Sequence, residues 1–505
     1  MFETGAALTH QEFGDPFPRM SWPTNYGRLA CATMFTLFFA GNDFAPKTFV
    51  DGVPVQEYLQ SHFANAMKEV AKILKDEQNV LGFDTLNEPS NGYVGLDDLR
   101  NAIFPVPLAH HMSAFDGMVL GSGIPRKVDM FSSPFVFNRT VLMNPNRVSV
   151  WQSPAHDVWR QNGVWDLDKS TNQPRLLRPN HFASLKSAGK DSSFVSRYML
   201  PFFQRVATAI REEAKDMVIF AEPHIEPKSP VHHHAPSREV LQSMGGSWAW
   251  VPHYYDAATL VTKTFRSWYA LDAERSTIVL GAWFANGVFQ RAARGLRRSG
   301  EGLPVLVGET GVPFDFQGTD FKDFSLQSQA LNRVLSAMER EFLSWTLWTY
   351  TPDNTNARGD LWNGEDLSLW SRDQVTNPAD LNSGGRGLEA AVRPYAMRIA
   401  GEPLETSFDP FGQRKKFYLK VRLSTREARK RQAAGHPLES VLFVPYIQYP
   451  KGIEWTVGGK GSSLLRALEG ATQGFVWRHD VSPGVTSVGE DEEFVDQWVE
   501  ITSKA

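Results

Sequence analysis

Two glutamates, each shortly after an apolar run, are the residues best placed to do chemistry. Glu88 comes after the run at residues 80–86, and Glu309 follows the run at residues 304–308. Cleaving a glycosidic bond with retention needs one carboxylic acid to protonate the leaving oxygen and one carboxylate to attack the anomeric carbon, about 5 Å apart. We therefore predict a retaining glycosidase in which Glu88 is the acid/base and Glu309 is the nucleophile.

The residues next to each glutamate fit these roles. The amide of Asn87 can hydrogen-bond the 2-hydroxyl of a sugar, and Pro89 shapes the turn that leaves the strand. Gly308 leaves room for a sugar to approach Glu309. As an acid, Glu88 must hold its proton near neutral pH, whereas the nucleophile must stay ionised. Asn-Glu-Pro alone is explained equally well by a turn with a solvated acid, so the prediction depends on the second acid several strands later.

The elements that must position these residues repeat along the chain. Apolar residues recur at helical spacing in residues 56–75 and 198–215, and a strand follows each time. Five short apolar strands are expected, each ending in polar or aromatic residues: 80–86, 217–221, 247–252, 303–307 and 344–349. Such repeats predict a parallel α/β sheet or barrel, and TIM barrels carry their active sites at that end of the strands.

Two regions depart from this pattern. Residues 92–191 are rich in Pro, Asn, Trp and His and poor in periodicity, so we expect an insertion that serves as a lid or a substrate wall. After residue 403, short alternating segments favour a small β-sandwich. The predicted organisation is a catalytic domain over residues 1–403, with the insertion near 92–191, and a sandwich over residues 404–505.

Bulk composition narrows the class of protein. The 505 residues are 42% hydrophobic and 21% charged, as in ordinary folded chains, and the net charge of −4 gives no basic field for nucleic acid. Cys31 is the single cysteine, and the N-terminus lacks the order of a signal peptide, so a cytosolic protein is expected. The apolar run at residues 29–40 is too short to span a bilayer and is expected to be a buried helix.

Two other groups of residues are weaker candidates. Glu222 also lies at a strand end before a proline, but it lacks the preceding asparagine, so we predict a pocket-lining or structural role rather than an essential acid. The three adjacent histidines at residues 232–234 point in different directions on a loop, and no carboxylate or cysteine spacing completes a metal site. We expect no metal and no cofactor.

The two strand ends resemble a known family. Residues 87–89 (NEP) and 308–311 (GETG) are similar to the strand ends of glycoside hydrolase family five, whose acid/base follows barrel strand four and whose nucleophile follows strand seven. Residues 22–26 (WPTNY), 33–41 (TMFTLFFAG) and 359–368 (GDLWNGEDLS) resemble the endoglycoceramidase-related proteins of fungi. That group includes glucosylceramidases and steryl β-glucosidases, and the resemblance extends from about residue 2 to the C-terminal sandwich.

The resemblance implies roles for four more residues. Asn87 would orient the 2-hydroxyl of the sugar. Tyr255 would hydrogen-bond Glu309 and tune its charge, and His253 would line the same pocket. Trp348 would form the platform under the sugar in the −1 subsite.

Two of these implied assignments extend to neighbouring residues. Trp345 is the rival for the platform role of Trp348, and whichever ring points away is expected to pack in the core. By the same likeness, the loop at residues 354–366 would form a wall of the glucose pocket.

The resemblance also implies a (β/α)8 TIM-barrel type fold that lacks its first three strands. The five expected strands correspond to barrel strands four to eight, and the family's His-Gln-Asp type motif has no counterpart before Met1. An open five-stranded sheet exposes an unpaired edge and apolar faces. We therefore expect weak or no turnover by the chain as it stands.

By this likeness, the expected activity is a retaining exo-β-glucosidase acting by double displacement on a membrane lipid glucoside, either a steryl β-glucoside or glucosylceramide. Two alternatives stay open: a non-catalytic glycolipid-binding protein, and an endo-acting glycoceramidase that removes whole glycans. The expected partner is the glycolipid itself, and peripheral contact of a cytosolic protein with internal membranes is left open.

Overall fold

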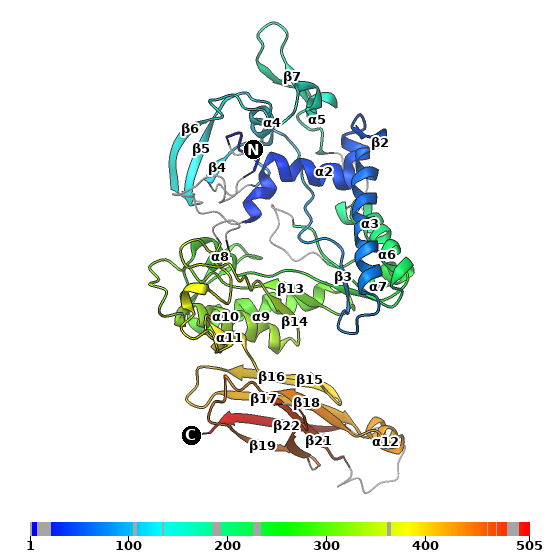
Figure 1. The fold of residues 1–505 in the computed structure, drawn as a ribbon, viewed down its shortest axis with the longest axis vertical. Helices are drawn as coiled ribbons and strands as arrows, with labels where there is room; N and C mark the ends of the chain where they lie inside the picture. The colour runs from blue at the N-terminus through cyan, green and yellow to red at the C-terminus, as the bar shows by residue number, and fades with distance from the viewer. Residues whose placement is uncertain are drawn as a thin grey trace.

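The chain is arranged in three parts along its longest axis (Figure 1). A computed structural model describes residues 3–7, 22–104, 109–133, 136–183, 193–225, 234–360, 365–461, 463–470, 472–481 and 494–504. The upper part in Figure 1 contains the N-terminal helices and a set of antiparallel strands. The middle part contains the later parallel strands with their helices, and the lower part contains two sheets and the C-terminus.

Five parallel strands lie next to one another in chain order. They are β3 (Gly82–Asp84), β9 (Val218–Ala221), β10 (Trp248–Trp250), β13 (Leu306–Thr310) and β14 (Ser344–Leu347). β9 pairs with β3 and β10, β13 pairs with β14, and single parallel bridges from Trp250 to Val305 and from His253 to Glu309 join the two groups. The five strands expected from the sequence are confirmed. Parallel strands that lie side by side in the order of the chain are typical of a TIM-barrel type sheet.

Helices connect and cover these strands. They are α2 (Leu29–Phe44), α3 (Val55–Leu74), α6 (Leu200–Glu213), α7 (Arg238–Ser243), α8 (Ala257–Thr262), α9 (Ala282–Ser299), α10 (Ser325–Arg340) and α11 (Leu388–Ala391). The helices expected near residues 29–40, 56–75 and 198–215 are therefore present. Within the described ranges, no helix has both the length and the apolar character that crossing a bilayer would require.

An aromatic cluster packs α6 against α2 and α3. The ring of Phe202 is fully buried and lies 5.1 Å from Phe38, 5.4 Å from Phe39 and 5.7 Å from Phe63, measured between ring centroids. The residues that α6 buries, which include Phe202 and Val206, recur on one face of the helix. This cluster supports the helix layer that lies beside β3 and β9.

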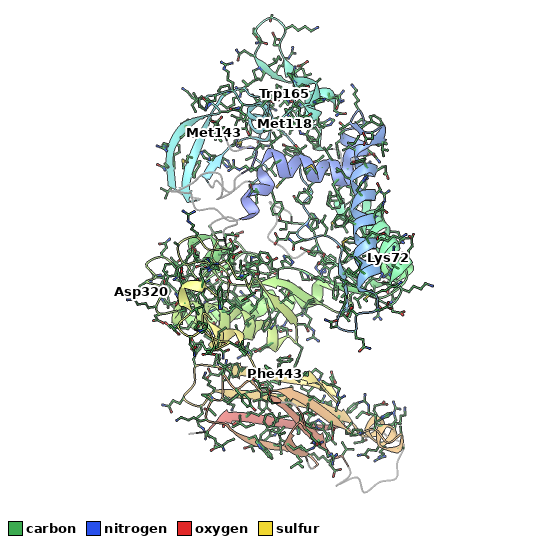
Figure 2. The ribbon with its side chains drawn as sticks, in the orientation of Figure 1. Lys72, Met118, Met143, Trp165, Asp320 and Phe443 are labelled. Carbon is green, nitrogen blue, oxygen red and sulfur yellow. The ribbon has the colours of Figure 1, made fainter. Side chains whose placement is uncertain are left out.

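The insertion at residues 92–191 is more ordered than its sequence indicated. It contains β4 (Ala109–His111), β5 (Arg126–Ser133), β6 (Val136–Met143), α4 (Ala114–Gly121), α5 (Val158–Gln161), β7 (Trp165–Leu167) and β8 (Pro174–Leu176). Figure 2 labels Trp165, Met118 and Met143 in this upper part. The indole N–H of the buried Trp159 donates to Thr33 Oγ1 at 3.0 Å and so holds the insertion on α2. β4, β7 and β8 have three residues each, and the longer β6 is exposed along most of its length, so the sequence pattern showed no period there.

The C-terminal part consists of two four-stranded antiparallel sheets with a shared apolar core. Their strands are β15 (Tyr395–Arg398), β16 (Glu402–Asp409), β17 (Lys416–Ser424), β18 (Glu439–Phe443), β19 (Ile453–Gly459), β20 (Ser463–Ala467), β21 (Gly474–His479) and β22 (Phe494–Ser503). Buried and less buried residues alternate along β17, as the sequence pattern predicted. β15 lies ahead of the domain boundary expected at 403/404, and the charged run at residues 426–431 forms part of helix α12 (Thr425–Ala433).

Arg393 links the sandwich to the middle part. Its guanidinium is buried and bonds both carboxylate oxygens of Glu339 on α10, at 2.5 and 2.8 Å. It also donates to the carbonyl of Phe408 on β16 at 3.3 Å and lies 5.0 Å from the centroid of that ring. Gln448 adds a second link, because its amide donates to the carbonyl of Val392 at 2.6 Å.

Several shorter elements complete the chain. They are η1 (Trp22–Gly27), β1 (Phe49–Val50), β2 (Val53–Pro54), η2 (Pro154–His156), the π-helical η4 (Val195–Met199), β11 (Tyr269–Asp272), β12 (Thr277–Leu280) and η5 (Arg372–Gln374). β11 and β12 form an antiparallel hairpin between α8 and α9. Among the strands that the structure describes, β3 pairs only with β9 and β14 only with β13, so each has one edge without a strand partner.

Removing the ring of Phe202 should test the importance of the aromatic cluster. Because the side chain is fully buried among other rings, we expect Phe202→Ala to lower the free energy of unfolding by about 3 to 5 kcal/mol. Urea unfolding followed by tryptophan fluorescence measures this. Leu326→Ala, at a half-exposed position of α10, is the control and should change it by less than about 0.5 kcal/mol. Equal effects of the two substitutions would contradict this account.

Candidate active site

A cavity of about 410 Å³ opens at the carboxyl ends of the parallel strands. It is lined by Asn87, Glu88, Tyr255, Leu260, Glu309, Trp348, Thr351, Asp360, Glu365 and Leu367. Five of the six site residues predicted from the sequence therefore face one cavity. The sixth, His253, lies beside them and contacts both glutamates.

The two glutamates converge. Carboxylate oxygens of Glu88 and Glu309 and a ring nitrogen of His253 all lie within 4.8 Å of one another. Retaining glycosidases hold their two carboxyl groups about 5 to 5.5 Å apart, whereas inverting enzymes need roughly 6.5 to 9.5 Å to admit a water molecule. The separation here fits the retaining arrangement.

Glu88 is held by four contacts from three segments. The hydroxyl of Tyr26 donates to Glu88 Oε2 at 2.9 Å, and His253 Nδ1 lies 3.0 Å from Glu88 Oε1. The Tyr26 hydroxyl is also 3.2 Å from the Glu88 carbonyl oxygen. The Glu88 N–H donates to Glu222 Oε1 at 2.6 Å. Tyr26 was not among the predicted site residues, although it belongs to the WPTNY segment that carried the family resemblance.

Glu309 lies at the end of β13 with a strong hydrogen-bond donor. The hydroxyl of Tyr255 donates to Glu309 Oε1 at 2.5 Å, and His253 Nδ1 lies 3.6 Å from Glu309 Oε2. Burial raises the pKa of Glu309 above its ordinary value, and the charge of Glu88 adds to this rise. His253 and the Tyr255 hydroxyl act in the opposite direction and favour the ionised nucleophile.

His253 balances the negative charge of the site. Burial alone would lower the pKa of His253, but the hydrogen bond to Glu88 and the charges of Glu309, Glu88 and Asp84 outweigh it and raise the pKa. The protonated ring would donate toward Glu88 from Nδ1, while Nε2 lies 3.4 Å from Glu222 Oε1. An imidazolium here offsets some of the repulsion between the closely spaced carboxylates.

The two tryptophans of β14 and its end have different environments. Trp348 lines the cavity and is 41% exposed, whereas Trp345 packs against the apolar core under α9 and α10. The peptide bond between Trp348 and Thr349 is cis. Of the two candidates for a sugar platform, only Trp348 faces the cavity.

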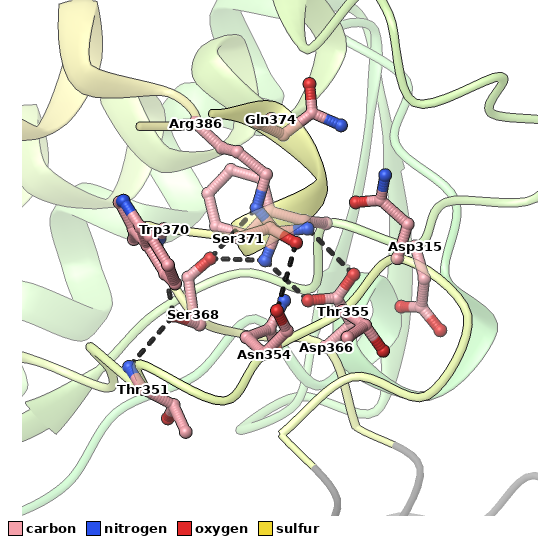
Figure 3. A network of polar contacts seen from close by, with 12 residues as sticks. Asp315, Thr351, Asn354, Thr355, Asp366, Ser368, Trp370, Ser371, Gln374 and Arg386 are labelled. Atoms are coloured by element: carbon pink, nitrogen blue, oxygen red, sulfur yellow. Dashed lines mark hydrogen bonds and ion pairs between the residues drawn. The ribbon is translucent and has the colours of Figure 1, made fainter. Parts of the chain in front are cut away.

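A buried ion pair fixes the wall of the cavity (Figure 3). Arg386 and Asp366 are almost completely buried and form two bonds, of 2.8 and 2.5 Å. Arg386 also donates to the carbonyl of Ser368 at 2.5 Å and lies 4.5 Å from the ring centroid of Phe314. Because Asp366 lies between Glu365 and Leu367, which both line the cavity, this pair positions the wall.

The wall loop agrees only in part with the loop expected at residues 354–366. Asp360 and Glu365 line the cavity, and residues 361–364 lie outside the described residues. Among the described residues that line the cavity, none comes from the insertion at 92–191. The role of the insertion as a lid or substrate wall stays a prediction.

The residues weighed as alternatives have other positions. Glu222 is 2% exposed, does not line the cavity and lies behind Glu88. Of the three adjacent histidines, His234 pairs with Glu301 at 2.6 Å, and residues 232 and 233 lie outside the described residues. The trio of Glu88, His253 and Glu309 is close enough to hold a cation, but two of its carboxylate oxygens already accept tyrosine hydroxyls.

Comparison with known proteins gives consistent relatives. A family model described as the glycoside hydrolase family 5 C-terminal domain matches residues 393–488. A glucosylceramidase of Rhizopus delemar is 33% identical over 457 residues, which is 81% of this chain and 63% of that protein. The ergosteryl-beta-glucosidase of Saccharomyces cerevisiae is 28% identical over 434 residues, which is 73% of this chain and 55% of that protein. This chain thus spans less than two thirds of the length of both relatives.

One solved structure covers the whole chain. The crystal structure of Cryptococcus neoformans sterylglucosidase 1 aligns with 100% of this chain and 76% of its own, at 25% identity and a TM-score of 0.82. The likeness therefore includes the five parallel strands, the insertion and the C-terminal sheets.

Breaking the buried ion pair of the wall should be costly. Arg386→Met leaves the Asp366 carboxylate buried without its partner, so we expect the free energy of unfolding to fall by about 3 to 5 kcal/mol. Arg372→Met is the matched control, since Arg372 and Asp353 form an exposed pair worth about 1 kcal/mol or less. Urea unfolding of both variants compares them, and similar losses would show that the buried pair does not hold the wall.

Proposed function

We propose that this chain, which belongs to the family of fungal glucosylceramidases and ergosteryl-β-glucosidases, hydrolyses the β-glucoside of a membrane lipid with retention of configuration. The observation that carries the proposal is the approach of the Glu88 and Glu309 carboxylates to within 4.8 Å at the carboxyl ends of β3 and β13. That separation allows direct attack on the sugar rather than attack by an intervening water molecule.

The proposed reaction has two steps. In the first, Glu309 attacks the anomeric carbon while Glu88 gives its proton to the oxygen of the departing lipid alcohol, leaving a glucosyl ester on Glu309. In the second, Glu88 takes a proton from water, which attacks the same carbon and releases glucose and the free Glu309 carboxylate. The hydroxyl of Tyr255, at 2.5 Å from Glu309 Oε1, stabilises the carboxylate before attack and after release.

Other cavity residues have supporting roles in this proposal. Asn87, next to Glu88, orients the 2-hydroxyl of the glucose, and the exposed face of Trp348 forms the platform under the ring. The carboxylates of Asp360 and Glu365 on the wall accept hydrogen bonds from further sugar hydroxyls. A wall beside the platform supports a pocket for one terminal glucose, and therefore exo action rather than endo action on a long glycan.

The aglycone we propose is a sterol or a ceramide. The relatives are named for ergosteryl β-glucoside and for glucosylceramide. Apolar side chains bind a sterol and a ceramide alike, so the residue types of a binding surface do not distinguish the two. The proposal therefore specifies the glucose and a membrane lipid alcohol, and activity measurements on both substrates assign the alcohol.

We also propose that the five parallel strands are equivalent to strands four to eight of an eight-stranded barrel. Three further strands between β14 and β3 would pair with the two edges that lack a strand partner among the described residues. They would also supply the remaining wall of the glucose pocket, so residues 1–505 alone should turn over slowly. Binding of glucoside without turnover would favour the alternative of a glycolipid-binding protein.

A patch of exposed apolar side chains, close in sequence to the cavity-lining Leu260, supports peripheral membrane contact. We call it the rim patch, and it consists of Trp268, Leu271, Ile278, Leu280, Trp283 and Phe284. Trp283 is 80% exposed and Phe284 60% exposed. The patch lies on the β11–β12 hairpin and the first turn of α9, and Leu260 of the preceding α8 lines the cavity. Exposed Trp and Phe clusters of this kind favour a lipid interface.

Replacing the nucleophile tests the reaction. Glu309→Gln removes the group that forms the covalent intermediate, so release of glucose from ergosteryl β-glucoside and glucosylceramide should fall by about three or more powers of ten. Glu301→Gln changes a surface glutamate that pairs with His234 and should leave the rate unchanged. Equal rates for wild type and Glu309→Gln would remove the assignment.

Replacing two rim-patch aromatics tests membrane contact. Burial of each ring contributes about 2 kcal/mol or more, so Trp283→Ser with Phe284→Ser should weaken binding to phosphatidylcholine vesicles at least tenfold in a sedimentation assay. Trp455→Ser, at a 41% exposed position of β19 in the sandwich, is the matched control and should bind like wild type. Unchanged binding of the double variant would rule out the rim patch as the contact.

A further inference from the structure

Glu222 is a buried acid directly behind the acid/base. It lies just after β9 and is 2% exposed. Its Oε1 accepts the backbone N–H of Glu88 at 2.6 Å and lies 3.4 Å from His253 Nε2. Its own N–H donates to Thr85 Oγ1 at 3.3 Å. Glu222 thus touches Glu88, His253 and the end of β3 without reaching the cavity.

The backbone of Glu88 has a conformation that needs support. Its φ is +43°, in the left-handed region that costs a residue with a side chain about 1 to 2 kcal/mol. The segment after β9 provides that support on both sides of the strained residue. Before it, the Glu88 N–H bonds Glu222, and after it, the Ile225 N–H donates to the Pro89 carbonyl at 2.6 Å.

From this geometry, we propose that Glu222 is a positioning residue for acid catalysis, which holds the peptide N–H of Glu88 so that its side chain reaches the glycosidic oxygen. The inference rests on the proposed function, because it assigns to Glu222 a part in the proton transfer that Glu88 performs. Glu222 does not itself touch the substrate. Its effect passes through the backbone of Glu88 and through the ring of His253.

The charge state of Glu222 fits this role. Burial, together with the charges of Asp84 and Glu88, raises the pKa of Glu222 far above its ordinary value, so the carboxyl stays neutral near pH 7. A neutral carboxyl still offers Oε1 as an acceptor, and it adds no further negative charge beside Asp84, Glu88 and Glu309. Glutamine has the same acceptor and no charge, whereas leucine has similar bulk and no acceptor, so these two substitutions separate the hydrogen bond from the packing.

Leaving-group dependence is the most direct measurement. A lipid alcohol needs a proton to leave, whereas dinitrophenolate does not, so a misplaced acid slows only the first kind of glucoside. For Glu222→Leu we expect kcat/KM for ergosteryl β-glucoside to fall about 100-fold and kcat/KM for dinitrophenyl β-glucoside to fall less than about fivefold. Glu222→Gln should stay within about threefold of wild type on both substrates.

Val206→Ala is the matched control for lost stability, since Val206 is fully buried in α6 and distant from the chemistry. This substitution should lower the free energy of unfolding, and it should change kcat/KM for both substrates by the same factor. If Glu222→Leu also slows both substrates equally, Glu222 is only structural and the proposal fails. If wild type releases glucose from neither glucoside, the proposed function fails instead.

Crystal structures decide the matter even without turnover. In Glu222→Gln, residue 88 should keep its positive φ, and in Glu222→Leu it should leave that region and move its carboxyl away from Glu309. An unchanged Glu88 backbone in Glu222→Leu would overturn the positioning role, whatever the state of the activity assay.

The pH dependence of stability gives an independent check. The folded-state pKa of Glu222 is raised above its ordinary value of 4.5. The neutral carboxyl therefore stabilises the folded state fully below pH 4.5, and this stabilisation is lost as the pH rises from 4.5 to the folded-state pKa. Glu222→Gln removes this titration. The titratable groups that face it, Asp84, Glu88 and His253, remain in both proteins. The free energy of unfolding of Glu222→Gln, minus that of wild type, should therefore increase from about pH 5 to about pH 9. If this difference stays constant or decreases, Glu222 is not neutral in the folded protein.

Discussion

The two carboxylates at the ends of β3 and β13 repel each other, and much of the site limits the cost of bringing them within 4.8 Å. Each accepts a hydroxyl from a different tyrosine, Tyr26 for Glu88 and Tyr255 for Glu309. His253 lies between them with a pKa that their charges raise. These donors come from distant parts of the chain, so the electrostatic arrangement depends on the folded sheet that brings them together.

The sequence was informative where function and local structure coincide. Each of the five short strands is an apolar run that ends in a chemically distinctive residue, so the strands, Glu88 and Glu309 could all be found by reading along the chain, and the family resemblance added the role of Tyr255. Tyr26 and Arg386 could not be assigned in this way. Tyr26 is 62 positions from Glu88, and Arg386 is 20 positions from Asp366, and no periodicity relates residues that meet only through tertiary packing.

Periodicity also set the limits of the fold prediction. In the sandwich, long strands such as β17 and β22 alternate clearly between buried and exposed positions, so their regions were recognised. β15 and β20 have only four and five residues, too few to show alternation. In the insertion, β7 and β8 have only three residues each, and the longer β6 is exposed along most of its length, so neither kind of strand shows alternation. The order of the insertion comes from buried aromatics such as Trp159, whose contacts with α2 cannot be read from local sequence.

The contacts of Arg393 limit how far the C-terminal sandwich can be exchanged between relatives. The guanidinium bonds α10 through Glu339 and the sandwich through the Phe408 carbonyl, while Gln448 of the sandwich holds the carbonyl of Val392. α10 leads directly into β14, whose end carries Trp348. The sandwich is therefore no interchangeable module, and grafting it from one relative to another would require these contact residues to be inherited as one set.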